Sequence, residues 1–200
     1  MSFKLYFKYG VMGCSKSAQA LMTKFNYEQQ GYNVLLMKSS YDTRDQKDGK
    51  IVVKSRIGLE ADAVVFTPKT NFVRLFKSKK AENIGVIIVD ECQFCTESQI
   101  NQLKELTAFV PVLCYGLKTD FRTKLFEGSK RLVEIADSMT ELKAICACGR
   151  KATINARFAN GKLVTRGSVI AIGGDERYKA LCYDCYLKLK KKQAKEKHTI

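Results

Sequence analysis

Short apolar runs alternate with helix-like stretches up to residue 136. The apolar runs predict strands at 3–10, 32–37, 63–66, 84–89 and 111–115, and helices are predicted at 17–30, 71–79, 98–109 and 124–136. Strands that alternate with helices imply right-handed βαβ crossovers and a parallel sheet, with the ligand site at the carboxyl ends of the strands. The polar stretch 38–54, which contains Asp42 and Arg44, is predicted to be an exposed functional loop.

A phosphate-binding loop is predicted where the first strand meets the first helix. Gly10, Lys16 and Ser17 fit the pattern G-x-x-x-x-G-K-[ST], in which backbone N–H groups surround phosphate oxygens, the Lys reaches the β/γ-phosphates and the hydroxyl holds Mg²⁺. Ser15 departs from the pattern, which has glycine there because that position needs a positive φ. The loop therefore needs a second signal to support it.

Two acidic residues at the end of a predicted strand give the second signal. The strand at 84–89 is followed directly by Asp90 and Glu91. In phosphate-transferring proteins of this architecture, an acidic residue at the end of a buried strand faces the phosphate loop and binds Mg²⁺. The only histidine, His198, lies in the C-terminal tail, so Glu91 is the candidate to accept a proton from an attacking hydroxyl. The alternative is that one carboxylate binds metal and its neighbour only hydrogen-bonds the loop.

The pattern changes near Leu142, where short segments, turns and clustered cysteines begin. Two close pairs of cysteines predict a structural Zn²⁺ site with all four positions closed: Cys146 and Cys148, then Cys182 and Cys185. We therefore expect three regions: a nucleotide-binding α/β domain at 1–141, a zinc-binding domain at 142–190 and a basic tail at 191–200.

The composition indicates which classes of partner and which cellular location to expect. The chain has 35 Lys and Arg against 20 Asp and Glu, a net charge of +15, and the excess is heaviest at 187–198. This positive charge suits polyanionic partners, although a charge run such as the tail is usually a solvated, frayed helix end. Neither a signal peptide nor an apolar run long enough to span a bilayer is present, so a cytoplasmic location without membrane contact is expected.

Seven motifs, in order, resemble the zinc-containing cytosolic thymidine kinases of type II, over about residues 3 to 190. They are YGVMGCSKS, DTR, SRIGLE, VDECQF, VLCYGLKTDF, ELKAICACGRKAT and IGGDERY followed by C-x-x-C. The resemblance implies a RecA-like P-loop α/β domain with a mainly parallel sheet, and a small zinc-anchored domain whose lasso loop closes over the nucleoside. It also implies transfer of the γ-phosphoryl group of ATP to the 5′-hydroxyl of thymidine or deoxyuridine, in nucleotide salvage for DNA synthesis.

The resemblance further implies the site residues. Glu91 is the catalytic base. The residues for ATP and Mg²⁺ are Gly10, Met12, Gly13, Cys14, Ser15, Lys16, Ser17, Asp42, Arg44, Asp90 and Gln93. Those around the thymine ring are Met12, Phe94, Leu117, Phe121, Phe126 and Tyr178, with the lasso backbone of Ile170, Ala171, Ile172, Gly173 and Gly174.

The resemblance also implies a homotetramer and thymidine triphosphate as a feedback inhibitor. The alternative function is a catalytically weak or silent nucleotide-binding relative, because Ser15 replaces the loop glycine. A nucleic-acid partner, suggested by the basic tail and the Asp-Glu strand end, is not expected, since RecA-type helicases need two such domains and 200 residues leave no room for them.

Overall fold

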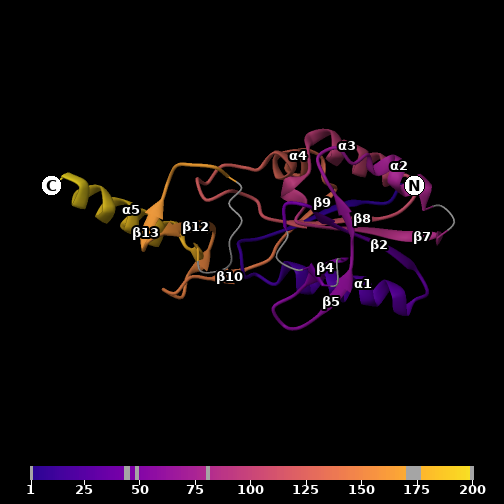
Figure 1. The fold of residues 1–200 in the computed structure, drawn as a ribbon, viewed down its shortest axis with the longest axis horizontal. Helices are drawn as coiled ribbons and strands as arrows, with labels where there is room; N and C mark the ends of the chain where they lie inside the picture. Colours follow the sequence, from indigo (N-terminus) through magenta and orange to yellow (C-terminus); the bar gives the residue numbers. More distant parts are fainter. Residues whose placement is uncertain (1, 43–45, 48–49, 80–81, 170–176, 199–200) are drawn as a thin grey trace.

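The computed structural model describes residues 2–42, 46–47, 50–79, 82–169 and 177–198, and Figure 1 shows a larger and a smaller lobe. The strands of the larger lobe are β1 (Leu5–Tyr9), β2 (Asn33–Ser39), β3 (Gln46–Lys47), β4 (Lys50–Lys54), β5 (Glu60–Asp62), β6 (Val64–Phe66), β7 (Ile84–Asp90), β8 (Val112–Gly116) and β9 (Ser138–Glu141). Its helices are α1 (Lys16–Gln29), α2 (Phe72–Ser78), the 3-10 turn η2 (Cys92–Phe94), α3 (Glu97–Leu106) and α4 (Glu127–Ile135). The smaller lobe contains β10 (Ala144–Ile145), β11 (Lys151–Ala152), β12 (Ile154–Ala159), β13 (Lys162–Val164), β14 (Tyr178–Leu181) and α5 (Tyr183–His198).

A six-stranded sheet in the order β6-β2-β7-β8-β1-β9 forms the centre of the larger lobe. Every pairing described within it is parallel, as the alternation of strands and helices predicts. Helices α2, α3 and α4 cover one face, while α1 lies on the other face together with β4 and β5 (Figure 1). The carboxyl ends of β1 and β7 therefore open at the same edge, which brings the loop after Tyr9 close to Asp90.

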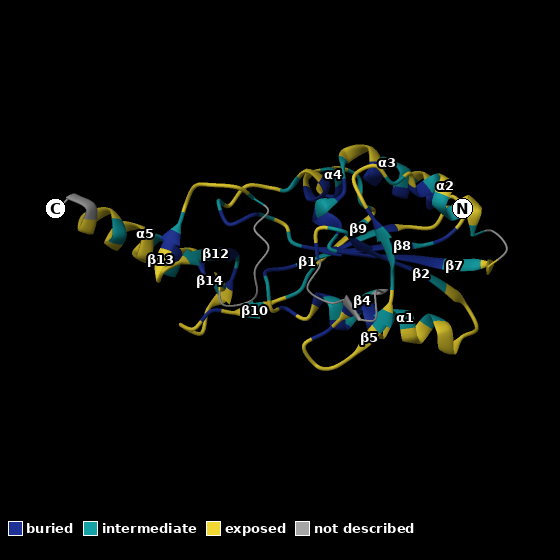
Figure 2. Cartoon of the chain, viewed as in Figure 1, coloured by how far each residue is buried: buried dark blue, intermediate teal, exposed yellow. Residues whose placement is uncertain are grey.

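Two apolar clusters hold the helices on the sheet. On one face, Ile100 and Leu103 of α3 and Leu132 of α4 are fully buried against β1, β7 and β8. On the other face, Ala20 of α1 and Val53 of β4 are fully buried against β7 and β8. The dark blue strands in Figure 2 mark this sheet as the most buried layer. Burial on both faces explains why the central strands are continuous apolar runs in the sequence.

The five predicted strands and four predicted helices are present within a few residues of their expected bounds. The prediction that 38–54 is an exposed loop is wrong. Strand β2 continues to Ser39, and β4 pairs antiparallel with β5 and buries Val52 and Val53. The short apolar run at 51–53 forms one strand that packs against α1. The polar residues on either side of this run made the whole segment look like a loop in the sequence. Strand β9, which is polar and at the sheet edge, was also missed.

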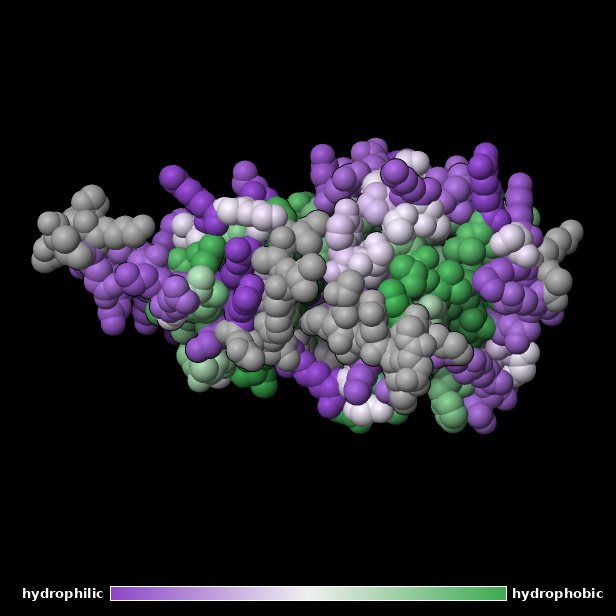
Figure 3. All heavy atoms as spheres, viewed as in Figure 1, coloured by the Kyte–Doolittle hydropathy of each residue, from purple (hydrophilic) through white to green (hydrophobic). Residues whose placement is uncertain are grey.

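The smaller lobe has a three-stranded antiparallel sheet, β13-β12-β14, beside the β10–β11 hairpin. Helix α5 is fastened to this sheet, since Gln193 accepts the N–H of Leu163 at 2.8 Å and donates to its carbonyl at 3.0 Å. Beyond that contact the helix is largely exposed, and hydrophilic residues dominate this end of the molecule in Figure 3. The basic stretch is therefore helical and docked through Gln193.

Within the described residues, none of the helices combines the length and the apolar character needed to cross a bilayer.

Candidate active site

The loop between β1 and α1 has the tight backbone that a phosphate-binding loop requires. A Cβ at Gly10 would clash with Cys14 and with the carbonyl oxygen of Leu142, so only glycine fits there. Gly13 has φ of 79°, and Ser15 has φ of 64° with ψ of 28°. Ser15 thus occupies the left-handed conformation that the glycine of the pattern would take, although a serine side chain is strained there. The loop shape survives the substitution.

Lys16 is the first residue of α1 and is 8% exposed. Its ammonium lies within the loop, where it donates to the carbonyl oxygen of Val11 at 2.9 Å and to that of Gly10 at 3.4 Å. It also lies 3.5 Å from the Cys14 sulfur. The ammonium is therefore held inside the concave side of the loop by backbone carbonyls.

The next residue links the loop to the end of β7. Ser17 Oγ donates to Asp90 Oδ2 at 2.9 Å, and the Glu91 N–H donates to Asp90 Oδ1 at 3.0 Å. Asp90 is 2% exposed. Burial, reinforced by the charge of Glu91, raises the pKa of Asp90 to about 7, against the lowering effect of these hydrogen bonds and of Lys38. A hydroxyl and a carboxylate in contact are a donor pair that suits Mg²⁺.

Glu91 has φ of 56°, a strained value for a non-glycine residue. Its carboxylate accepts a hydrogen bond from the Gln93 amide. The oxygen of that amide accepts the N–H of Leu117 at 3.0 Å, so Gln93 joins Glu91 to the loop that follows β8. Gly116 is required beside it, because a Cβ there would lie 2.5 Å from Gln93 Oε1. Gln93, which is held by the Leu117 N–H after β8, therefore orients the Glu91 carboxylate.

A buried ion pair lies next to these carboxylates. Lys38 Nζ is 3.3 Å from Asp42 Oδ2 and donates to the Val52 carbonyl oxygen at 3.0 Å. Lys38 and Asp90 are paired positions on the neighbouring strands β2 and β7. Asp42 therefore lies at the edge of the site formed by the phosphate loop and Asp90, and the ammonium of Lys38 offsets negative charge on these two carboxylates. Arg44 lies outside the described residues.

Aromatic side chains gather beyond Glu91. The ring of Phe94 lies 5.8 Å from Phe126 and 5.5 Å from Tyr41, between ring centroids. Phe121 is 2% exposed, and the guanidinium of Arg157 lies 4.7 Å from its ring centroid. Tyr41, Phe94 and Phe126 thus form one aromatic cluster, and Phe121 lies in the same loop as Phe126. Aromatic clusters of this kind accommodate a nucleobase.

Strand pairing places Tyr178 next to Arg157, which contacts Phe121. Tyr178 is opposite Arg157 in the β12–β14 register, and directly opposite residues share a face of the sheet. The predicted lasso residues Ile170, Ala171, Ile172, Gly173 and Gly174 lie outside the described residues.

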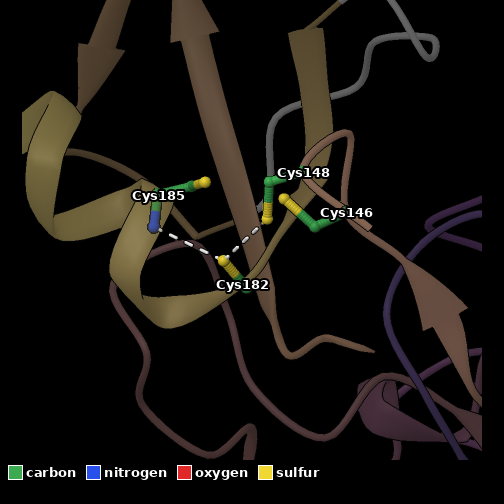
Figure 4. Close-up of side chains that lie close together, drawn as sticks. All are labelled: Cys146, Cys148, Cys182 and Cys185. Atoms are coloured by element: carbon green, nitrogen blue, oxygen red, sulfur yellow. Dashed lines mark hydrogen bonds between the residues drawn. The ribbon is translucent and has the colours of Figure 1, made fainter. Parts of the chain in front are cut away.

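Four cysteines converge in the smaller lobe, as the close pairs predict (Figure 4). Cys146 and Cys148 lie in the turn between β10 and β11, Cys182 follows β14 and Cys185 lies in α5. Their sulfur atoms all lie within 4.8 Å of one another. Tetrahedral Zn²⁺ with bonds of about 2.3 Å needs sulfur atoms about 3.8 Å apart, so the donor set fits zinc with no ligand position left for substrate.

The protonation of these thiols also suits a metal. Backbone N–H groups of Cys148 and Cys182 lower the pKa of Cys146 to about 6. Hydrogen bonding to Cys182 and Cys148 raises the pKa of Cys185 to about 12. A thiol with a lowered pKa gives up its proton more readily, which favours coordination of a metal ion at Cys146.

A comparison with protein families identifies the chain. Residues 3–186 match the family model described as thymidine kinase. The chain belongs to the thymidine kinase family. A thymidine kinase of Shewanella oneidensis is 43% identical over 183 residues, which cover 90% of this chain and 94% of that protein. One of Zymomonas mobilis is 44% identical, with coverage of 90% and 93%.

Among solved structures, a Pif1 helicase from Candida albicans is similar over 72% of this chain and 36% of its own, with a TM-score of 0.42 and 14% identity. That likeness is too distant to bear on function.

Membership of the thymidine kinase family agrees with the resemblance read from the motifs. Two buried polar residues near the site were not predicted from the sequence, Lys38 and Asn155. Lys38 follows an apolar run and precedes Asp42 by four residues, a spacing that hints at an ion pair. Asn155 lies between Ile154 and Ala156 with no local signal, because both of its hydrogen-bond partners are distant in the sequence.

Proposed function

We propose that this chain transfers the γ-phosphoryl group of ATP to the 5′-hydroxyl of thymidine or deoxyuridine. The observation that supports it most directly is the Ser17 to Asp90 hydrogen bond at 2.9 Å, which joins the phosphate loop to the acidic strand end within a thymidine kinase family sequence. Phosphoryl transfer depends mainly on positioning and charge neutralisation, and the buried groups around this bond offer both.

In this proposal the loop residues 10–17 bind the phosphates of ATP, with Lys16 as the main cation. Ser17 and Asp90 hold Mg²⁺, which when bound neutralises charge on the β- and γ-phosphates. Glu91 accepts the proton of the 5′-hydroxyl, and its hydrogen bond from Gln93 supports that orientation. Asp42 and Arg44 approach the phosphates from the side.

The base lies among the aromatic residues beyond Glu91 in this proposal. Phe94, Phe121 and Phe126, with Met12, Leu117 and Tyr178, surround the thymine ring, and the lasso 170–174 hydrogen-bonds its edge. Reading a base with backbone groups in a closed loop suits a small nucleoside better than a nucleic acid.

The assembly, regulation and location belong to the same proposal. It includes a structural zinc on the four cysteines, a homotetramer, inhibition by thymidine triphosphate and a cytoplasmic location. The small lobe at 142–190 is the zinc-binding domain, the nucleotide-binding domain covers 1–141, and 191–200 is a basic tail. Ser15 keeps the left-handed backbone of the pattern, which supports an active enzyme over a silent relative.

The test is ATP-dependent phosphorylation of thymidine and of deoxyuridine by the purified protein. Glu91→Gln should lower kcat by at least about a hundredfold, the usual contribution of a general base, with little effect on ATP binding. Glu105→Gln, the same change at an exposed position of α3, should leave kcat unchanged. ATP binding by the parent protein without phosphorylated product would refute the proposal.

A further inference from the structure

The smaller lobe contacts the phosphate loop at two successive residues. Val11 is 6% exposed and belongs to the apolar cluster of that lobe, with Ile154 and Ala156 of β12. The next residue, Met12, donates its backbone N–H to Asn155 Oδ1 at 2.8 Å. The start of the phosphate loop is therefore fastened to the sheet of the smaller lobe as well as to β1.

Asn155 makes a second hydrogen bond, to a different loop. Its Nδ2 donates to the carbonyl oxygen of Thr119 at 3.0 Å. Because the Met12 N–H can only donate and the Thr119 carbonyl can only accept, the two partners fix the orientation of the amide. Asn155 is 3% exposed, so water does not compete for these bonds. One buried side chain thus joins the loop after β1 to the loop after β8.

The same strand reaches the second loop again two residues later. Arg157 shares a face of β12 with Asn155, since alternate residues of a strand point the same way. Its guanidinium lies 4.7 Å from the ring centroid of Phe121 and donates to the carbonyl oxygen of Ser168 at 2.7 Å. Strand β12 therefore positions the loop at 117–126 through a hydrogen bond and a cation–π contact.

We infer that Asn155 is a positioning residue for nucleoside binding, which sets the spacing between Met12 and the 117–126 loop. The inference rests on the proposed function, in which Met12 and that loop enclose the base. The phosphate side of the loop has separate anchors, the Ser17 bond to Asp90 and the carbonyl contacts of Lys16. Loss of the Asn155 amide therefore acts on the nucleoside more than on ATP.

Two substitutions test this selectivity. Asn155→Leu removes both hydrogen bonds at similar volume. Asn155→Asp keeps an acceptor for Met12 but turns a carboxylate oxygen toward the Thr119 carbonyl. Each should raise the KM for thymidine about tenfold, the effect of leaving buried polar partners unpaired, with a much smaller change in the KM for ATP. Asn160→Asp, the same change in the exposed β12–β13 turn, should alter neither KM.

Hydrogen exchange gives a readout that needs no turnover. In Asn155→Leu, peptides that cover Met12 and 117–126 should exchange faster, while those of β7 keep the parent rate. Equal rises of both KM values, or a lower melting temperature with an unchanged thymidine KM, would reduce Asn155 to a structural residue and overturn the inference. If the parent protein neither binds nor phosphorylates thymidine, the proposed function fails, and the exchange rates of the two loops still decide whether Asn155 joins them.

Discussion

Ser15→Gly should stabilise the protein, because Ser15 is held in a conformation that disfavours a side chain. Its φ of 64° and ψ of 28° lie in the left-handed region. The side chain is exposed and makes no capping hydrogen bond to α1, so its removal costs no contact at the helix start.

The expected gain follows from two opposing effects. An L-residue in the left-handed region is less stable by about 1–2 kcal/mol, and glycine avoids this strain. Glycine also loses more conformational freedom on folding, which offsets about 0.5–1 kcal/mol. The difference between the middle values of these two ranges is a net stabilisation of about 0.8 kcal/mol. For a domain of this size, 1 kcal/mol shifts the melting temperature by about 2–4 °C, so an increase of about 1–4 °C is expected.

The assay is thermal unfolding of the purified proteins without ligand, followed by circular dichroism. Ser15→Ala is the matched control, since it removes the hydroxyl and keeps the Cβ in the same backbone conformation. It should show no increase in melting temperature. If Ser15→Gly melts at or below the parent temperature, or if Ser15→Ala gains as much, the strain argument is wrong.

Three further predictions concern Gly116, Asp90 and the cysteine cluster. Gly116→Ala places a Cβ 2.5 Å from Gln93 Oε1, and overpacking of this kind should lower the free energy of unfolding in urea by about 1–3 kcal/mol. It should also lower kcat, because Gln93 orients Glu91, and an unchanged urea midpoint would contradict the prediction. The pKa of Asp90 is raised from 3.8 to about 7, so the folded state keeps this proton at pH values where the unfolded state has lost it. The stability that this group contributes is therefore fully present below about pH 4 and is lost as the pH rises to about 7. Without Mg²⁺, the melting temperature of Asp90→Asn should therefore gain on that of the parent between about pH 4 and 7, and a constant difference over this range would refute the argument. Removal of zinc by a chelator should lower the melting temperature of the parent, and Cys185→Ser should melt lower and release zinc more readily, as measured by a colorimetric zinc assay.

The sequence predicted the elements whose signals are local. Periodic apolar residues located α1 and the central strands, and Lys16, Ser17 and Asp90 were placed together because strand ends of a parallel sheet share one edge. The four cysteines were grouped from the spacing within each pair, and they do converge. In each case the relevant partners are either neighbours in the chain or fixed by the class of fold.

The residues that were missed depend on contacts between distant segments. Lys38 ends an apolar run with a charged residue, and its burial depends on β4, where the Val52 carbonyl oxygen accepts a hydrogen bond from its ammonium. Asn155 bonds to Met12, 143 positions away, and to Thr119, 36 positions away. A single buried asparagine has no periodic signature, so only the packing of the two lobes reveals what it contacts.

The contacts between the lobes connect the proposed zinc site to the phosphate loop. Val11 packs in the same apolar cluster as Cys146 and Cys182, two of the four cysteines, and Asn155 holds the next loop residue. A lobe with so small an apolar core would gain much of its stability from a metal bound to the four cysteines. With zinc on the four cysteines, its loss would loosen the support of Val11 and Met12 together. Under the proposed function, a structural ion in the smaller lobe would affect nucleoside binding through the packing of β12 against the loop.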